Sequence, residues 1–407
     1  CRSRRRFRKW NASSSALPRS VVAKPSGVPL VALCAANLLQ AVELALLGSQ
    51  GPKAPLFEKI VADYCGSKYG VAANSATSAL HIACMALNLS IGDRLWTSPN
   101  SFVASANCAL YCGAKVDFVD IDPSTYNLST KALEKKLIQA KQDNKLPKIV
   151  IPVHFAGQSC DMEKIHSLGK EYGFKIIEDA SHSIGGSYKK NKIGMCEFSD
   201  ITVFSFHPVK IITTAEGGMA TTNDSNLFER MQLFRTHGVT RDPKLMTKKT
   251  EGEWYYQQVD LGFNYRMTEL QAALGISQMR RVDEFVNKRK ILKNRYDELL
   301  SGLPVIKPYH SNNIISALHL YPIQIDTSNT KVCRNNVFNS LKKGGIGVNV
   351  HYIPIHTQPY YKEMGFEYGD FPISENYYNN AISLPLFSQM SFEEQDKVVD
   401  TLKKALK

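Results

Sequence analysis

From residue 51 onward, apolar and polar positions alternate along the chain in the manner of an α/β protein. Short apolar runs, of which residues 148–153 are the clearest, are typical of strands covered on both faces of a parallel sheet. Between these runs lie longer segments whose apolar residues recur at helical spacing. This succession predicts an α/β fold with a mostly parallel sheet.

The predicted elements fall into two units. In the first unit, helices are expected over residues 57–64, 75–87, 102–111, 131–141, 162–172, 267–278 and 282–300. Strands are expected there over residues 70–73, 94–97, 115–120, 148–153, 175–178, 201–205 and 219–222. The last two strands should form a hairpin whose connection contains Lys210. A smaller α+β unit follows, with a strand at 319–325, an extended segment at 348–353 and helices at 335–342 and 392–406.

The first fifty residues differ from the rest of the chain. Residues 1–28 are basic and contain no acidic residue, and residues 29–47 are mostly apolar but interrupted by polar ones. A targeting segment is one interpretation. A membrane anchor is another, although an uninterrupted apolar span of about 18 residues is missing. We favour an amphipathic first helix over residues 38–47 combined with a divergent or non-native leader. The expected divisions are therefore a leader (1–49), a large domain (50–300) and a small C-terminal domain (301–407).

Charge and cysteine content narrow the possible partners. The net charge is +13, but eight basic residues precede the first acidic residue, Glu43, and leave only +5 for the remainder. Because no later basic stripe is interleaved with aromatic residues, we expect no nucleic-acid partner. The nine cysteines are scattered, with no C-x-x-C pair and no histidine at zinc-site spacing. We therefore expect no metal, no membrane partner, and buried free thiols in a reducing compartment such as the cytoplasm.

Candidate chemistry is concentrated around Lys210. Residues 203–210 form an apolar run that contains Ser205 and ends in this lysine, and the predicted strand about thirty residues earlier is followed by Asp179. A lysine amine can form a Schiff base with the aldehyde of pyridoxal 5′-phosphate (PLP), while a carboxylate keeps the pyridine nitrogen protonated and hydroxyls bind the phosphate. This pattern predicts a PLP site with Lys210 and Asp179 as catalytic residues.

Several motifs, in order and at matching spacing, resemble the DegT/DnrJ/StrS family of nucleotide-sugar aminotransferases. They are the segments 176–182, 203–210 and 262–273, and the resemblance extends from about residue 51 to the C-terminus. It implies the PLP-dependent transferase fold type I, which is like that of aspartate aminotransferase. It also implies that Lys210 carries the cofactor and then moves the proton between the substrate carbon and the cofactor.

The resemblance also implies a set of cofactor-binding residues. Ser205 would bind the phosphate, while Phe102 and His182 would pack against the ring; a core phenylalanine and a structural histidine are the alternative interpretations. Thr77 and Ser78 open a predicted helix, where backbone N–H groups and hydroxyls can bind a phosphate or simply cap the helix.

Asn264 matches a residue that reaches the phosphate in the neighbouring subunit. If it does so here, the enzyme is a homodimer with a shared active site.

Substrate residues are implied in two places. The segment Asn349, Val350, His351 and Tyr352 matches a part of the family that lines the sugar site, and so does Gln50–Gly51; the first segment could equally fill a half-buried strand. Segments 107–120, 205–210 and 350–354 further resemble one subgroup, the UDP-4-amino-4,6-dideoxy-N-acetyl-β-L-altrosamine transaminases of pseudaminic acid biosynthesis. That subgroup transfers an amino group from L-glutamate to C4 of a UDP-linked 4-keto-6-deoxy-N-acetyl hexose.

Other functions remain open at this point. The chain could act on another 4-keto or 3-keto nucleotide sugar, because the residues themselves do not select the position. A sugar 3-dehydratase of the same fold would carry histidine where this chain has Lys210. A PLP-binding regulatory relative without turnover is disfavoured, because Lys210, Asp179, Ser205 and Asn264 are all present.

Overall fold

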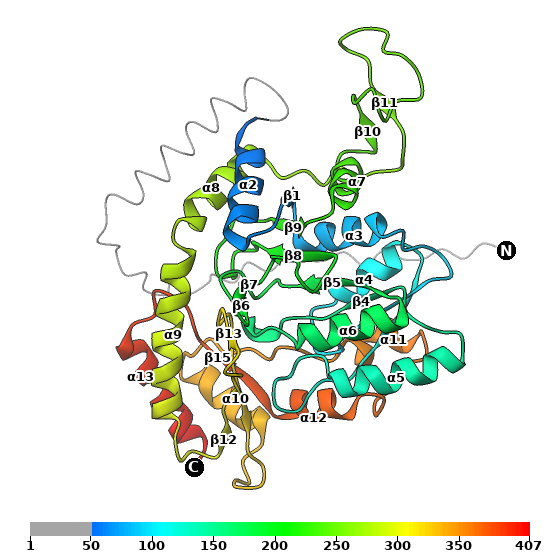
Figure 1. The fold of residues 1–407 in the computed structure, drawn as a ribbon. Coiled ribbons are helices and arrows are strands. Elements are labelled where there is room, and N and C mark those ends of the chain that lie inside the picture. Colours follow the sequence, from blue (N-terminus) through cyan, green and yellow to red (C-terminus); the bar gives the residue numbers. More distant parts are fainter. Residues whose placement is uncertain (1–50) are drawn as a thin grey trace, which may run out of the picture.

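The computed structural model describes residues 51–407, and its centre is a seven-stranded sheet (Figure 1). The strand order is β1-β9-β8-β5-β4-β2-β3. The bounds are β1 (Tyr69–Ala73), β2 (Arg94–Thr97), β3 (Lys115–Phe118), β4 (Ile149–Ile151), β5 (Lys175–Asp179), β8 (Ile201–Ser205) and β9 (Gly218–Thr222). The strands from β8 to β3 are parallel, and β9 is antiparallel to both of its neighbours. The predicted mostly parallel sheet and the hairpin around Lys210 are thus confirmed.

Helices cover both faces of this sheet. One face carries α3 (Ala76–Ala86), α4 (Ala104–Tyr111) and α7 (Ser225–Arg235). The other carries α2 (Lys53–Cys65), α5 (Thr130–Gln142), α6 (Met162–Tyr172) and α8 (Glu269–Met279). Successive strand residues point to opposite faces, so Ile177 packs with α3 and α4 while Ile176 packs with α5 and α6. Asp179 therefore shares the α3–α4 face, and Glu178 points to the opposite one.

A smaller antiparallel sheet follows the long helix α9 (Val282–Leu299). Its strands are β12 (Val305–Ile306), β14 (Tyr321–Ile325) and β15 (Ala381–Leu384), accompanied by α10 (Arg334–Lys343) and α13 (Phe392–Ala405). Leu292, Tyr296 and Leu300 belong to the same apolar core as this sheet. The end of α9 thus packs with the smaller unit, and the boundary at residue 300 stays a prediction.

The extended segment predicted at 348–353 does not form a regular strand. Asn349 makes one isolated bridge to Ser383. The N–H groups of Val350 and Tyr352 then donate to side-chain oxygens of Asn349 and Asn100 instead of to a neighbouring strand. The segment is therefore a loop anchored at defined points.

The remaining elements are short, and two of them lie in an arm that projects from the main body. Those outside the arm are β6 (Ser187–Tyr188), β7 (Asn191–Lys192), β13 (Ile314–Ile315), α11 (Pro359–Lys362) and α12 (Pro372–Asn380). The arm carries β10 (Val239–Thr240) and β11 (Gln257–Gln258) and extends away from the main body (Figure 1). Within residues 51–407, no helix is both long and apolar enough to cross a membrane.

Candidate active site

A cavity of about 340 Å³ opens beyond the carboxyl ends of β4, β5 and β8. Ligand sites of open α/β sheets lie in this position. The chain connections that leave neighbouring strands there run to opposite faces of the sheet, and a crevice forms between them. The cavity brings together seven residues predicted from the sequence: Thr77, Phe102, Asp179, His182, Ser205, Lys210 and Tyr352.

Lys210 lies in the connection between β8 and β9, where its N–H donates to the carbonyl of His207. Burial lowers the pKa of the Lys210 amine to about 8, although the negative charge of Asp179 opposes this shift. Among the described residues the amine has no hydrogen-bond partner. Because its pKa is lowered, a larger fraction of this amine is neutral near neutral pH than of an exposed lysine, and the neutral form can attack an aldehyde and can accept a proton.

Asp179 is held at both carboxylate oxygens. Its Oδ1 accepts a hydrogen bond from the N–H of Ser181 at 3.1 Å, and its Oδ2 accepts one from the hydroxyl of Ser105 at 2.6 Å. The Ser105 hydroxyl in turn lies 2.9 Å from that of Ser101. Asp179 is 5% exposed, so these contacts fix a buried carboxylate that faces the cavity.

His182 and Tyr352 form a hydrogen-bonded pair at the same cavity. The N–H of Ala156 donates to Nδ1 of His182, so this nitrogen carries no proton. Burial, and then the nearby Lys210, lower the pKa of His182 well below its usual value, so the ring is neutral with its proton on Nε2. Nε2 therefore donates to the Tyr352 hydroxyl, 3.1 Å away, which leaves the proton of that hydroxyl free to point into the cavity.

The N-terminus of α3 provides a site for an anion. The side chain of Ser75 caps the helix by accepting from the N–H of Ser78 at 3.1 Å, and the two hydroxyls are 3.0 Å apart. Ser78 is buried and does not line the cavity. Ala76 and Thr77 do line it, and no hydrogen bond within the described chain uses their N–H groups. Open N–H groups at a helix N-terminus are suited to a phosphate.

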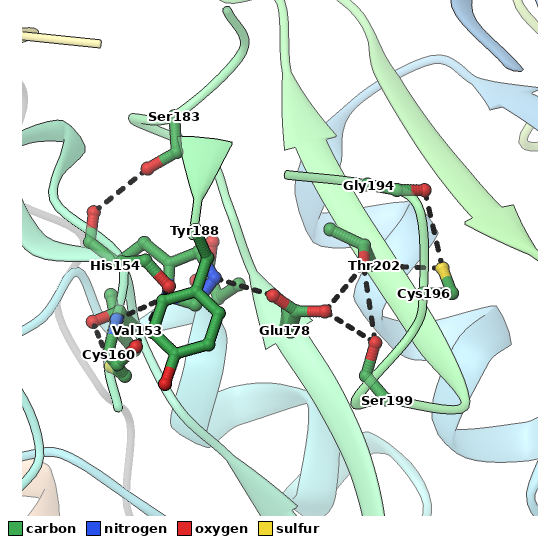
Figure 2. Close-up of polar contacts among 12 residues, drawn as sticks. Val153, His154, Cys160, Glu178, Ser183, Tyr188, Gly194, Cys196, Ser199 and Thr202 are labelled. Atoms are coloured by element: carbon green, nitrogen blue, oxygen red, sulfur yellow. Dashed lines mark hydrogen bonds and ion pairs between the residues drawn. The ribbon is translucent and has the colours of Figure 1, made fainter. Parts of the chain in front are cut away.

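A buried network supports the site from the opposite face of the sheet (Figure 2). Nε2 of His154 donates to Glu178 at 2.6 Å, and the hydroxyls of Ser199 and Thr202 also donate to this carboxylate. Burial alone would raise the pKa of Glu178, but these hydrogen bonds outweigh it and hold the pKa below its usual value. Because His154 follows β4 and Glu178 precedes Asp179, the network ties the ends of two strands that border the cavity.

Other predicted residues lie elsewhere. Gly51 and Asn264 line a separate cavity of about 700 Å³, together with Arg266. Gln50 lies outside the described residues.

Asn349, Val350 and His351 do not line the first cavity, and Nδ1 of His351 is 2.8 Å from the hydroxyl of Ser383. Burial and then the nearby Lys210 lower the pKa of His351 to about 4.

The donor set of the first cavity fits PLP. It combines the Lys210 amine with its lowered pKa, a carboxylate on Asp179, and hydroxyls and open N–H groups around Thr77 and Ser205. Phe102 is 60% exposed although it lines the cavity, so its ring is available to stack on a flat ligand. Sequence reasoning missed Ser101, Ser105 and Ala156, because their contacts arise only when α4 and the loop after β4 are placed beside β5.

Comparison with known proteins agrees with this chemistry. The model of the DegT/DnrJ/EryC1/StrS aminotransferase family matches residues 34–403. The chain belongs to this family. It is therefore a PLP-dependent aminotransferase of fold type I, as the resemblance implied. The match begins earlier than the residue near 51 from which the resemblance was expected, inside the segment set apart as a leader.

Three relatives show how far the similarity extends. The UDP-4-amino-4,6-dideoxy-N-acetyl-β-L-altrosamine transaminase of Campylobacter jejuni is 37% identical over 360 residues, which cover 86% of this chain and 89% of that protein. The GDP-perosamine synthase of Caulobacter vibrioides is 34% identical over 371 residues, or 91% and 94% of the two chains. A solved structure, Helicobacter pylori PseC, is an aminotransferase involved in the biosynthesis of pseudoaminic acid. It is 31% identical in sequence, with a TM-score of 0.81, and the match covers 92% of this chain and 96% of that chain. These findings support aminotransfer to a nucleotide-linked sugar.

Proposed function

We propose that this enzyme transfers an amino group from L-glutamate to C4 of a UDP-linked 4-keto-6-deoxy-N-acetyl hexose, in the biosynthesis of pseudaminic acid. The observation that carries the chemistry is that Lys210 and Asp179 line the same cavity. The choice of sugar is supported by the names of the Campylobacter and Helicobacter relatives. The perosamine relative marks the main alternative, which is another keto nucleotide sugar.

In this proposal, Lys210 holds PLP covalently, Asp179 binds the pyridine nitrogen, and Thr77 and Ser205 bind the phosphate. When bound, PLP carries the amino group from glutamate to the keto carbon, and its protonated ring withdraws electrons from the carbon that loses a proton. Phe102 and His182 then lie against the ring.

Proton transfer falls to Lys210. Once the amino donor has displaced it, its free amine removes the proton from the donor carbon and later returns a proton to the sugar carbon. A pKa of about 8 suits both directions near neutral pH, because the amine exchanges its proton readily there. Tyr352, which lines the cavity and whose hydroxyl proton is free to donate, would bind a sugar oxygen.

The remaining predicted residues belong to the proposed sugar site and to a proposed homodimer. Asn349, Val350 and His351 would border the sugar site behind Tyr352, and Gln50 and Gly51 would help to close it. Because Asn264 lines a separate cavity, a role at the cofactor phosphate requires a second copy of the chain. We place this homodimer in the cytoplasm.

A panel of keto sugars tests the proposed substrate. Purified enzyme is incubated with PLP, L-glutamate and 4-keto or 3-keto sugars linked to UDP, dTDP or GDP, and amino-sugar formation is followed by mass spectrometry. We expect the UDP-linked 4-keto-6-deoxy-N-acetyl hexose to react fastest and Lys210→Ala to give no product.

Faster amination of another sugar would overturn the substrate assignment but not the aminotransferase activity. Binding of PLP without turnover of any sugar would instead indicate a regulatory relative.

A further inference from the structure

The first turn of α4 reaches the carboxylate of Asp179. Ser105 is completely buried, and its hydroxyl lies 2.6 Å from Oδ2 of Asp179. Asp179 points to this helix because it shares the strand face of Ile177, which packs in the core of α3 and α4. The contact joins residues 74 positions apart in the chain, so it exists only in the folded protein.

The direction of the hydrogen bonds follows from the chemistry of the groups. A carboxylate oxygen accepts, so the single hydroxyl proton of Ser105 is donated to Asp179. The oxygen of Ser105 can then accept from Ser101, whose hydroxyl is 2.9 Å away. Ser101 is also buried and lines the cavity. The hydroxyls of Ser101 and Ser105 thus form a hydrogen-bonded chain from the cavity wall to the carboxylate of Asp179.

The second oxygen of Asp179 is also fixed. The N–H of Ser181 donates to Oδ1 at 3.1 Å, and this backbone group follows directly after the end of β5. With one fixed donor on each oxygen, rotation of the carboxylate would break at least one hydrogen bond in a buried site. The cost of an unpaired buried charge is larger than that of an exposed one.

We propose that Ser105 is a positioning residue for Asp179. Its hydroxyl, ordered by Ser101, holds the carboxylate in the orientation that binds the pyridine nitrogen of PLP and keeps that nitrogen protonated. This inference rests on the proposed role of Asp179. It assigns to the buried hydroxyls of Ser101 and Ser105 a function that a purely structural serine pair would not have.

Three variants separate positioning from packing. Ser105→Ala removes the donor to Asp179, and Ser101→Ala removes only the donor to Ser105. Ser159→Ala is the matched control, because Ser159 is a buried serine whose hydroxyl donates to the backbone carbonyl of Cys160. Thermal unfolding of each apo-protein shows which variants fold.

Two measurements that do not depend on turnover are made on each variant. The dissociation constant for PLP comes from equilibrium titration of the apo-enzyme, and the protonation of the ring comes from the ¹⁵N chemical shift of bound, ¹⁵N-labelled PLP. For Ser105→Ala we expect a roughly tenfold larger dissociation constant for PLP, as for loss of a hydrogen bond to a charged group. We also expect the ¹⁵N chemical shift to move toward that of an unprotonated ring. Ser101→Ala should move both quantities less, and Ser159→Ala should leave both unchanged.

Asp179→Asn separates the inference from the function on which it rests. If this variant loses ring protonation while folded Ser105→Ala keeps the wild-type ¹⁵N shift and affinity, Ser105 does not position Asp179. An equal loss of affinity in Ser159→Ala would reduce the effect of Ser105 to packing. If Asp179→Asn itself leaves the ¹⁵N shift unchanged, the proposed role of Asp179 fails, whatever the serine variants show. If Ser105→Ala does not fold, Ser101→Ala decides the question. A wild-type ¹⁵N shift in that variant would overturn the proposal that these hydroxyls position Asp179.

Discussion

Individual residues of this site owe their chemistry to burial. Lys210 loses solvent at the cavity wall, which lowers the pKa of its amine to about 8, and His182 becomes a neutral hydrogen-bond donor for the same reason. That Lys210 and Asp179 lie at one cavity could be predicted from the sequence, because each comes at or after the end of an apolar strand in a characteristic motif. Ser105 could not, because nothing near it in the chain indicates that α4 packs beside β5.

The lowered pKa of Lys210 predicts how capture of PLP depends on pH. Only the neutral amine attacks the aldehyde, so the capture rate should rise about tenfold per pH unit below the pKa and level off above about 8. Stopped-flow absorbance of apo-enzyme mixed with PLP measures this rate. In Asp179→Asn the midpoint should move to lower pH, because the charge of Asp179 raises the pKa of Lys210. A rate that kept rising toward 10.5, the ordinary value for lysine, would contradict this account.

At the scale of secondary structure, the N-termini of α2 and α3 differ in whether their backbone N–H groups are capped. The N-terminus of α3 leaves N–H groups open at the cavity. That of α2 is closed by Glu269, which accepts from the N–H groups of Lys53 and Ala54 at 2.7 and 3.0 Å. The sequence predicted α2 and α8, because both show helical periodicity. It gave no sign that a carboxylate on α8 caps α2 from more than 200 residues away.

Removal of this cap should destabilise the protein. Glu269→Ala removes the carboxylate that accepts from two N–H groups of α2, and we expect the free energy of unfolding to fall by about 1–2 kcal/mol. Urea denaturation followed by circular dichroism measures the change. Glu298→Ala is the control, because Glu298 is an exposed carboxylate on α9 with no hydrogen bond among the described residues. Equal unfolding midpoints for the two variants would show that the cap does not stabilise α2.

Close packing at the start of β9 should matter for the phosphate site. A Cβ on Gly218 would lie 2.5 Å from the backbone nitrogen of Ala76, so Gly218→Ala must displace the N-terminus of α3. We expect a loss of about 1–3 kcal/mol in stability and weaker binding of PLP. Gly347→Ala is the control, since a Cβ there would meet no atom within 4 Å. The titration of apo-enzyme with PLP compares them, and equal affinity would exclude α3 as the phosphate site.

At the scale of the whole molecule, the sequence predicted the mostly parallel sheet and its hairpin but not the arm or the second cavity. The alternation of strands and helices specifies an α/β sheet, whereas the arm has two very short strands and exposed apolar residues such as Trp254, Tyr256 and Leu261. Such side chains, on a segment that extends from the main body, are typical of a surface that meets a partner. This agrees with the proposed homodimer, in which Asn264 serves the other subunit.

Mixed dimers test whether the active site is shared. Lys210→Ala and Asn264→Ala subunits should each be inactive alone. If Asn264 serves the partner's site, a mixed dimer contains one site with both residues intact, so an equal mixture after refolding should recover about a quarter of wild-type activity. No recovery, with mixed dimers demonstrated by mass spectrometry, would show that each site is built from one chain.

The central claim is that Lys210 is the residue that binds PLP covalently, and one measurement tests it directly. Apo-enzyme is incubated with PLP and reduced with borohydride, which makes the bond between a lysine amine and the cofactor permanent, and the modified peptide is identified by mass spectrometry. We predict that the cofactor is found on Lys210 and that Lys210→Ala carries none at stoichiometric PLP. Stoichiometric labelling of a different lysine, or an unlabelled wild-type protein, would contradict the account.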